Sequence, residues 1–201
     1  MIDKANLSFD VSYKIKGVLA PEGELVEDNA LSVIKGEIED EEGEVIGKVK
    51  FYQIDTVAFW DQDFSLEDVL DLHSETARFM QFINEWGDFE IETENLELLS
   101  PPSLLILSRL EVVAKYRGYG LGRRMVDDIK NRFCNSTDLF LLQSFPLQLE
   151  ASDSEDDVQW NNNMGFNHFE KDDEEARNSL GAYYESLGFK KIRGEFYFLD
   201  I

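Results

Sequence analysis

The stretch Leu104–Met125 reads LLILSRLEVVAKYRGYGLGRRM, and it decides the fold. Its first part, Leu104–Val113, is mostly apolar and has the length of one buried strand. A glycine-rich turn follows, and apolar residues then recur at steps of four from Leu121 to Phe133, which predicts a helix. The stretch is therefore a strand, a short turn and a helix in immediate succession.

The turn Arg117–Gly122 has the chemistry of an anion site. Its three glycines let the backbone fold tightly with N–H groups facing outward. The helix that begins here adds unpaired N–H groups and its positive dipole end, so the turn suits a diphosphate. It is not a nucleotide P-loop, because no Gly-Lys-Ser/Thr follows, and its glycine spacing differs from the dinucleotide fingerprint. A purely structural turn is the alternative.

Hydrophobic periodicity predicts the other elements on both sides of this stretch. Strands are expected at 6–16, 31–38, 45–54, 138–144 and 195–199. Helices are expected at about 65–87, with Ser65 as N-cap and Asp68 as its acidic partner, and at about 174–186. Residues 87–102 and 150–172 are acidic and polar, and we expect surface loops there. The sequence thus predicts one α/β domain over 1–201, with a mixed, mostly antiparallel central sheet flanked by helices.

The composition narrows the classes of partner. With 19 Lys and Arg against 42 Asp and Glu, the net charge is −23, which disfavours binding to nucleic acid and to anionic membranes. An acidic surface can steer a cationic acceptor, and plain solubility is the alternative. There is no membrane-length apolar run and no signal-peptide core, and Cys134 is the single cysteine, so we expect a cytoplasmic protein.

The sequence gives little support for a metal site or for a catalytic nucleophile. Two histidines and one cysteine leave little material for zinc, and the acidic loops lack calcium-loop spacing, so no metal is expected. No Cys-His or Ser-His-Asp arrangement is supported either, because Cys134 sits at a helix end and His168 in an acidic loop.

Two motifs resemble those of a known family. Arg117-x-x-Gly120-x-Gly122 is similar to the Arg/Gln-x-x-Gly-x-Gly/Ala signature of the GNAT superfamily of N-acetyltransferases. Downstream, Tyr184 followed by Gly188-Phe189 resembles the family's Tyr-x-x-x-Gly-Phe element. The resemblance covers about 104–199 well and the N-terminal strands loosely. Residues 17–30 are too short for the helices that members carry between their first two strands, so the acceptor side is expected to be rebuilt.

The resemblance implies a GNAT-like fold that uses acetyl-coenzyme A as acyl donor. The cofactor-binding core would span about 104–144, and a helix-strand element about 174–201 would complete it. The residues that the resemblance assigns to the cofactor are Leu110, Val112, Arg117, Gly118, Tyr119, Gly120, Leu121, Gly122 and Arg123. The diphosphate would rest on the turn and the pantetheine arm along the strand, while Arg123 is equally well explained as a solvated helix residue.

The implied reaction transfers an acetyl group to an unidentified primary amine by direct attack in a ternary complex. An alkylamine is mostly protonated at neutral pH, with a pKa of about 10.4 for lysine, so a general base is needed. Glu111 is the candidate base, with a surface role as the alternative. Tyr184 matches the tyrosine that protonates the departing thiolate, with core packing as the alternative. The acceptor would be a small-molecule or peptide amine, and a homodimer is left open. A non-catalytic acyl-coenzyme A-binding or protein-interaction domain is the alternative function.

Overall fold

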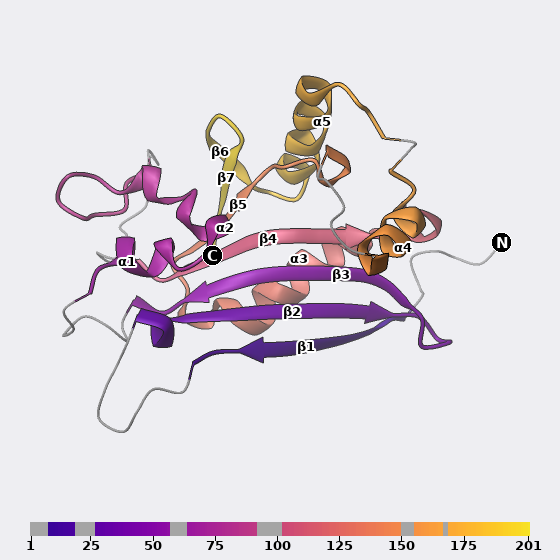
Figure 1. Ribbon diagram of the computed structural model, residues 1–201, viewed down its shortest axis with the longest axis horizontal. Coiled ribbons are helices and arrows are strands. Elements are labelled where there is room, and N and C mark those ends of the chain that lie inside the picture. The colour runs from indigo at the N-terminus through magenta and orange to yellow at the C-terminus, as the bar shows by residue number, and fades with distance from the viewer. Residues whose placement is uncertain (1–7, 19–26, 57–63, 92–101, 150–154, 167–168) are drawn as a thin grey trace.

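A seven-stranded sheet in the order β1-β2-β3-β4-β5-β7-β6 forms the centre of the computed structural model (Figure 1). The structure describes residues 8–18, 27–56, 64–91, 102–149, 155–166 and 169–201. The strands are β1 (Asp10–Lys16), β2 (Leu31–Glu39), β3 (Val45–Ile54), β4 (Leu104–Val112), β5 (Leu139–Gln143), β6 (Lys190–Arg193) and β7 (Phe196–Asp200). β4 and β5 run parallel, whereas each other neighbouring pair is antiparallel. The predicted α/β class with a mixed, mostly antiparallel sheet is confirmed.

Helices cover both faces of the sheet. They are α1 (Leu66–Asp71), α2 (Ser74–Ala77), α3 (Leu121–Phe133), α4 (Glu155–Met164) and α5 (Asp173–Ser186), with 3-10 turns at η2 (Glu27–Ala30), η4 (Met80–Phe82), η5 (Ala114–Tyr116), η6 (Cys134–Ser136) and η7 (Leu147–Leu149). Figure 1 shows α3 behind the sheet, with α1 and α2 in front of it. Strand side chains alternate accordingly: Phe140 and Leu142 join the α3 face, whereas Leu139 and Leu141 join the α1 face.

The helix expected at about 65–87 is wrong. The structure has α1, α2 and η4 in its place, and His73 between the two helices has an extended backbone with φ −138° and ψ 140°. The predicted N-cap is confirmed, because the Ser65 side chain accepts from the Asp68 N–H and the Asp68 carboxylate accepts from the Ser65 N–H. Apolar side chains of α1 and η4, together with Phe79 just before η4, pack on the same face of the sheet, and this shared burial produces the helical spacing that the sequence displays.

Two further elements differ from expectation. The surface loop expected at 150–172 is wrong in part, because α4 lies within it. Trp160 and Met164 of this helix reach the core, and the Met164 carbonyl accepts from Arg117 Nη2 (2.6 Å). Sequence periodicity also missed β6, a strand that is joined to β7 by a tight turn with Gly194 at φ 55°. The turn explains the hairpin, because glycine adopts a positive φ without steric cost.

The register between β4 and its neighbours opens the sheet at one end. β5 pairs with β4 only from Leu104↔Leu139 to Leu107↔Leu142, and the second half of β4 has β3 alone as its partner. On the β3 side the register shifts where Lys50 pairs with Arg109 and Phe51 with Leu107, so Ser108 is a bulge. The two parallel strands therefore separate after Leu107, and the backbone of β4 beyond it faces a gap.

Candidate functional site

A cleft of about 460 Å³ lies at the gap between β4 and β5. Its walls come from the second half of β4, the turn before α3, the segment after β5, the end of α4, and one face of α5. The predicted cofactor residues that line it are Leu110, Val112, Arg117, Gly118, Gly120, Leu121 and Gly122. The structure thus brings seven of the nine residues together around one cavity.

The N-terminus of α3 faces this cleft without a side-chain cap. Gly120 occupies the N-cap position with φ 73°, and no side chain bonds to the first turn of the helix. Gly118 also has a positive φ of 80°, and a Cβ added at either glycine would meet nothing within 4 Å. Uncapped N–H groups and open space above two glycines are what an anionic group needs for close approach to a backbone.

The free edge of β4 offers backbone groups along the cleft. The Val113 N–H donates to the Ile46 carbonyl (2.9 Å), so Glu111, two residues earlier, bonds β3 in the same way. The N–H and C=O groups of Leu110 and Val112 therefore point to the opposite side, toward the gap left by β5. An extended ligand lying there would pair with β4 as another strand does.

Arg117 fastens the turn from inside the cleft wall. Its Nε donates to the Val112 carbonyl (3.0 Å), its Nη2 donates to the Met164 carbonyl, and its guanidinium lies 4.3 Å from the centre of the Phe169 ring. One side chain thereby connects β4, α4 and the segment after α4. We assign Arg117 to the architecture of the cleft, where its charge also faces any anionic ligand.

The two tyrosines of α5 have different surroundings. Tyr184 is 8% exposed and lines the cleft, and its ring packs edge-on against Phe189. Burial, with a smaller contribution from Tyr183, raises the pKa of Tyr184 well above its ordinary value. Tyr183 is 40% exposed, so Tyr184 is the inner tyrosine of the pair. The phenol of Tyr184 is therefore neutral and holds its proton across the physiological pH range.

Gly122 makes room for Tyr183. A Cβ at Gly122 would lie 2.0 Å from the Tyr183 hydroxyl oxygen, a distance that real contacts do not reach. The sequence singled out this glycine for backbone contact with a ligand, but its immediate neighbour is the α5 side chain. The first turn of α3 and the α5 helix can approach each other here because residue 122 lacks a side chain.

Two of the predicted cofactor residues point elsewhere. Arg123 does not line the cleft, and its Nη2 donates to the Ser186 carbonyl at the end of α5. Tyr119 packs its ring 5.9 Å from that of Tyr116 and is likewise absent from the cleft wall. Both side chains brace the turn from outside the cavity.

Glu111 lies on the opposite face of β4 from the cleft, in a buried charged cluster. It is 3% exposed, its carboxylate accepts from Arg109 Nη1 (3.2 Å), and it stands directly across from Lys48 on β3. Burial raises the pKa of Glu111, although the positive charge and hydrogen bond of Arg109 oppose this. The indole N–H of Trp160 also lowers the pKa of Glu111, although this N–H makes no well-aligned hydrogen bond among the described residues. A surface role, the alternative for Glu111, does not fit this burial.

Sequence analysis missed the aromatic wall of the cleft. This wall combines the segment that follows β5 with the end of α4 and the residues after it, and it consists of Phe145, Pro146, Leu147, Phe166 and Phe169. Pro146 marked the end of a strand, but nothing in its neighbourhood indicated which face the flanking side chains would cover. The segments meet only because the sheet opens between β4 and β5.

A second, smaller hollow of about 50 Å³ lies on the α1 face of the same gap. It shares residues on β4 and after β5 with the cleft and adds Glu75, Arg78 and Phe79 from the helical side. The shared residues are Ser108, Arg109, Gln143, Phe145 and Leu147. The opening between β4 and β5 thus has a large side toward α3 and α5 and a small side toward α2.

Among the described residues, no three His, Cys, Asp or Glu side chains gather closely enough to hold a metal ion. None of the described helices combines the length and the apolar character that crossing a membrane requires. His168 lies outside the described residues.

Comparison with known proteins gives a weak structural likeness. No protein-family model matches the sequence, and no curated protein matches it. Among solved structures, the fold is similar to that of a GNAT-family acetyltransferase from Listeria monocytogenes, with 13% identity and a TM-score of 0.37. The match covers 82% of this chain and 61% of the other, which is less than two thirds of that protein's length. Likeness at this level assigns neither an activity nor a substrate.

Proposed function

We propose that this protein transfers the acetyl group of acetyl-coenzyme A to a primary amine. The observation that carries the proposal is the cleft between β4 and β5, with the uncapped N-terminus of α3 at one wall and Tyr184 at another. An anion site, a free strand edge and a proton donor around one cavity are the groups that a long anionic thioester needs. Acetyl-coenzyme A would supply an acyl group that is activated by its thiol leaving group.

The donor side of the cleft fits such a ligand along its length. The backbone above Gly118 and Gly120 would hold the diphosphate, because the N–H groups there are uncapped and the space is open. The N–H groups of Leu110 and Val112 and the C=O of Leu110 would pair with the amides of the pantetheine arm, whereas the Val112 C=O accepts from Arg117 Nε. The apolar wall formed by the segment after β5 would exclude water from this arm, and Arg117 adds a positive charge to the same cavity.

Tyr184 is suited to donate a proton inside the cleft. Its phenol stays neutral at physiological pH because burial raises its pKa. The raised pKa makes the phenol a weaker acid, so it would first stabilise the thiolate by a hydrogen bond and transfer its proton as charge develops on the sulfur. A thiolate that leaves in a buried cavity needs such a donor, since no bulk water stabilises its charge there. We assign Tyr184 as the general acid.

Glu111 is suited to accept a proton on the acceptor side. Its raised pKa makes the carboxylate a stronger base than an exposed glutamate, and it lies on the face of β4 that the small hollow shares. It does not line that hollow itself, so we propose that a water carries the proton from the amine to Glu111. Arg109, which bonds to Glu111 and lines the hollow, would position this water.

The proposal is tested by calorimetry with coenzyme A, followed by release of free thiol from acetyl-coenzyme A in the presence of a panel of primary amines. We expect binding and amine-dependent thiol release. A second candidate function, acyl-coenzyme A binding without turnover, is favoured by the separation of Glu111 from the cleft wall. Binding without release on any amine would select that candidate, and no binding would overturn both.

Replacing Glu111 with Gln separates its chemical role from its structural one. We expect kcat to fall roughly 100-fold, within the usual range for a general base, and the acidic limb of the pH profile to disappear. The substitution should not lower the stability of the fold. A carboxyl group whose pKa is raised by folding stabilises the folded state at low pH, and this stability is lost as the pH rises through the raised pKa. At neutral pH the ionised Glu111 carboxylate therefore lowers the free energy of unfolding. The midpoint of thermal unfolding at pH 7 should therefore stay the same or rise. A lowered midpoint with an intact acidic limb would remove Glu111 from the mechanism.

A further inference from the structure

The small hollow on the α1 face is rich in cations although the chain as a whole carries a charge of −23. On the strands around it, Lys48 stands across from Glu111 and Lys50 across from Arg109, and all four side chains share one face. Arg78 and Glu75 come from α2 and its C-cap. Four cationic and two acidic side chains thus come from this face of β3 and β4 and from α2 with its C-cap, and three of them, Glu75, Arg78 and Arg109, line the hollow itself. In the molecule as a whole, acids outnumber bases more than two to one.

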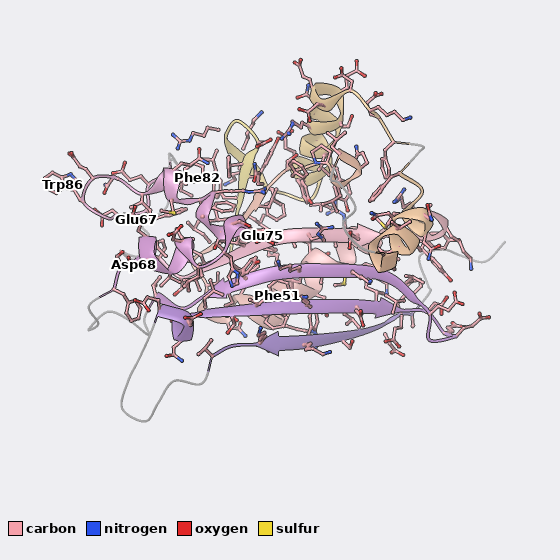
Figure 2. The ribbon with its side chains drawn as sticks, in the orientation of Figure 1. Phe51, Glu67, Asp68, Glu75, Phe82 and Trp86 are labelled. Atoms are coloured by element: carbon pink, nitrogen blue, oxygen red, sulfur yellow. The ribbon has the colours of Figure 1, made fainter. Side chains whose placement is uncertain are left out.

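Both carboxylates of this cluster are already engaged. Glu75 accepts from Lys50 Nζ (2.5 Å), and it lies in front of the central strands in Figure 2. Burial alone would raise the pKa of Glu75, but the hydrogen bond and charge of Lys50 outweigh it and lower the pKa to about 2. Glu111 bonds to Arg109. Lys50 pairs with Glu75 and Arg109 with Glu111, whereas Arg78 bonds to the uncharged amide of Gln143, so Arg78 contributes most of the positive charge at the hollow.

Arg78 is held in place at the rim of the hollow while staying open to solvent. Its Nη1 donates to Gln143 Oε1 (2.9 Å), and its guanidinium lies over the Phe145 ring at 5.9 Å. Gln143 in turn donates to Glu195, which pairs with Arg177. This chain of contacts fixes the plane of the guanidinium, and a fixed planar fork is the geometry that binds a carboxylate through two hydrogen bonds.

The size of the hollow limits what it can hold. The hollow measures about 50 Å³, against about 460 Å³ for the cleft. This small volume suits a small group such as a carboxylate. The hollow is adjacent to the donor cleft, because five residues line both. A group bound in the hollow would therefore lie close to the cleft that is proposed to hold the acyl donor.

We propose that the acceptor is an amine that also carries a carboxylate, as an amino acid does, and that Arg78 and Arg109 bind this carboxylate in the small hollow. The proposal rests on the acyl-transfer function proposed above and names the class of its acceptor. The acidic residues elsewhere on the chain do not argue against it, because the charge within a few ångströms of the hollow has the opposite sign.

Matched acceptors test the proposal: each common amino acid against its carboxamide, compared by kcat/KM for thiol release from acetyl-coenzyme A. The amide has the less basic amine and presents more of its reactive free form at neutral pH, so reactivity alone favours the amide. We expect the best amino acid to exceed its amide by about 10- to 100-fold, the usual value of a hydrogen-bonded charge pair. Arg78→Gln should remove most of this preference, while Arg132→Gln on the far face should keep it.

The possible results separate the two proposals. Turnover with equal rates for acids and amides, or a preference that survives in Arg78→Gln, would overturn the carboxylate site and leave acyl transfer standing. Absence of coenzyme A binding and of turnover would instead remove acyl transfer. In that case a second measurement decides about the hollow: NMR shifts of the arginine Nε–H signals on titration with amino acids, assigned by loss in Arg78→Gln. Shifts with the acids but not with the amides support the site, and their absence overturns it.

Discussion

Replacing Tyr184 with Phe should lower kcat by roughly 100-fold, at the low end of general-acid contributions, while coenzyme A affinity stays within a few-fold. The ring is retained, so its packing against Phe189 and the fold of α5 should survive. What is lost is the phenolic proton, which burial holds in place by raising the pKa of Tyr184. Single-turnover and steady-state thiol release, together with calorimetry, measure the two quantities separately.

Tyr183→Phe is the matched control, because it removes the same hydroxyl from the neighbouring position. Tyr183 is 40% exposed and its hydroxyl lies beside Gly122, so its loss should change kcat only slightly. The pH profile adds a second check. Since the pKa of Tyr184 is raised, its ionisation should not limit activity up to about pH 10, the ordinary pKa of a phenol. Equal losses in the two variants would mean that packing, not proton donation, is what Tyr184 supplies.

Sequence reasoning succeeded where local rules and tertiary packing agree. The stretch that begins at Leu104 has a continuous apolar strand, glycines at the turn and a clean four-residue step in the helix, and α3 has the predicted bounds Leu121–Phe133. The strands β2 and β3 and the N-cap at Ser65 were predicted for the same reason. In each case, a few neighbouring residues contain all the information.

Prediction from the sequence failed where the spacing of apolar residues reflects burial against one face of the sheet and not a single continuous helix. Most apolar residues from Leu66 to Phe82 pack on one side of the sheet, and their spacing imitates one helix although His73 is extended. In α4, polar composition hid a helix whose support comes from distant residues such as Arg117.

The candidate site was predictable on the donor side only. Gly118 and Gly120 indicate a tight turn by their residue type, since a positive φ favours glycine, and the structure shows open space above both. The position of Arg78 could not be predicted from the sequence, because the structure predicted for its segment was wrong and its partner Gln143 is 65 residues away. The local charge around the small hollow could not be predicted from the sequence either. The net charge is a sum over the whole chain, whereas the cationic side chains near the hollow come from three separate elements.

Gly120→Val should reduce coenzyme A affinity by roughly 100-fold or more, the largest binding effect that we expect from one substitution. Two costs combine. A β-branched residue is an outlier at φ 73°, and its side chain would occupy the open space above the uncapped first turn of α3. Only the second cost concerns the ligand. A substitution at a glycine elsewhere in the chain measures the first cost alone.

Gly43→Val provides that separation, because Gly43 has φ 79°, meets nothing within 4 Å of an added Cβ, and lies in the β2–β3 turn outside the cleft wall. Both variants should lose similar stability, about 1–2 kcal/mol or more, from the left-handed backbone. Calorimetry should then show coenzyme A binding lost in Gly120→Val and retained in Gly43→Val. If both variants bind coenzyme A like the parent, the N-terminus of α3 does not hold the diphosphate. If both lose binding, strain propagating through the fold explains the effect, and the anion site at Gly118 and Gly120 loses its support.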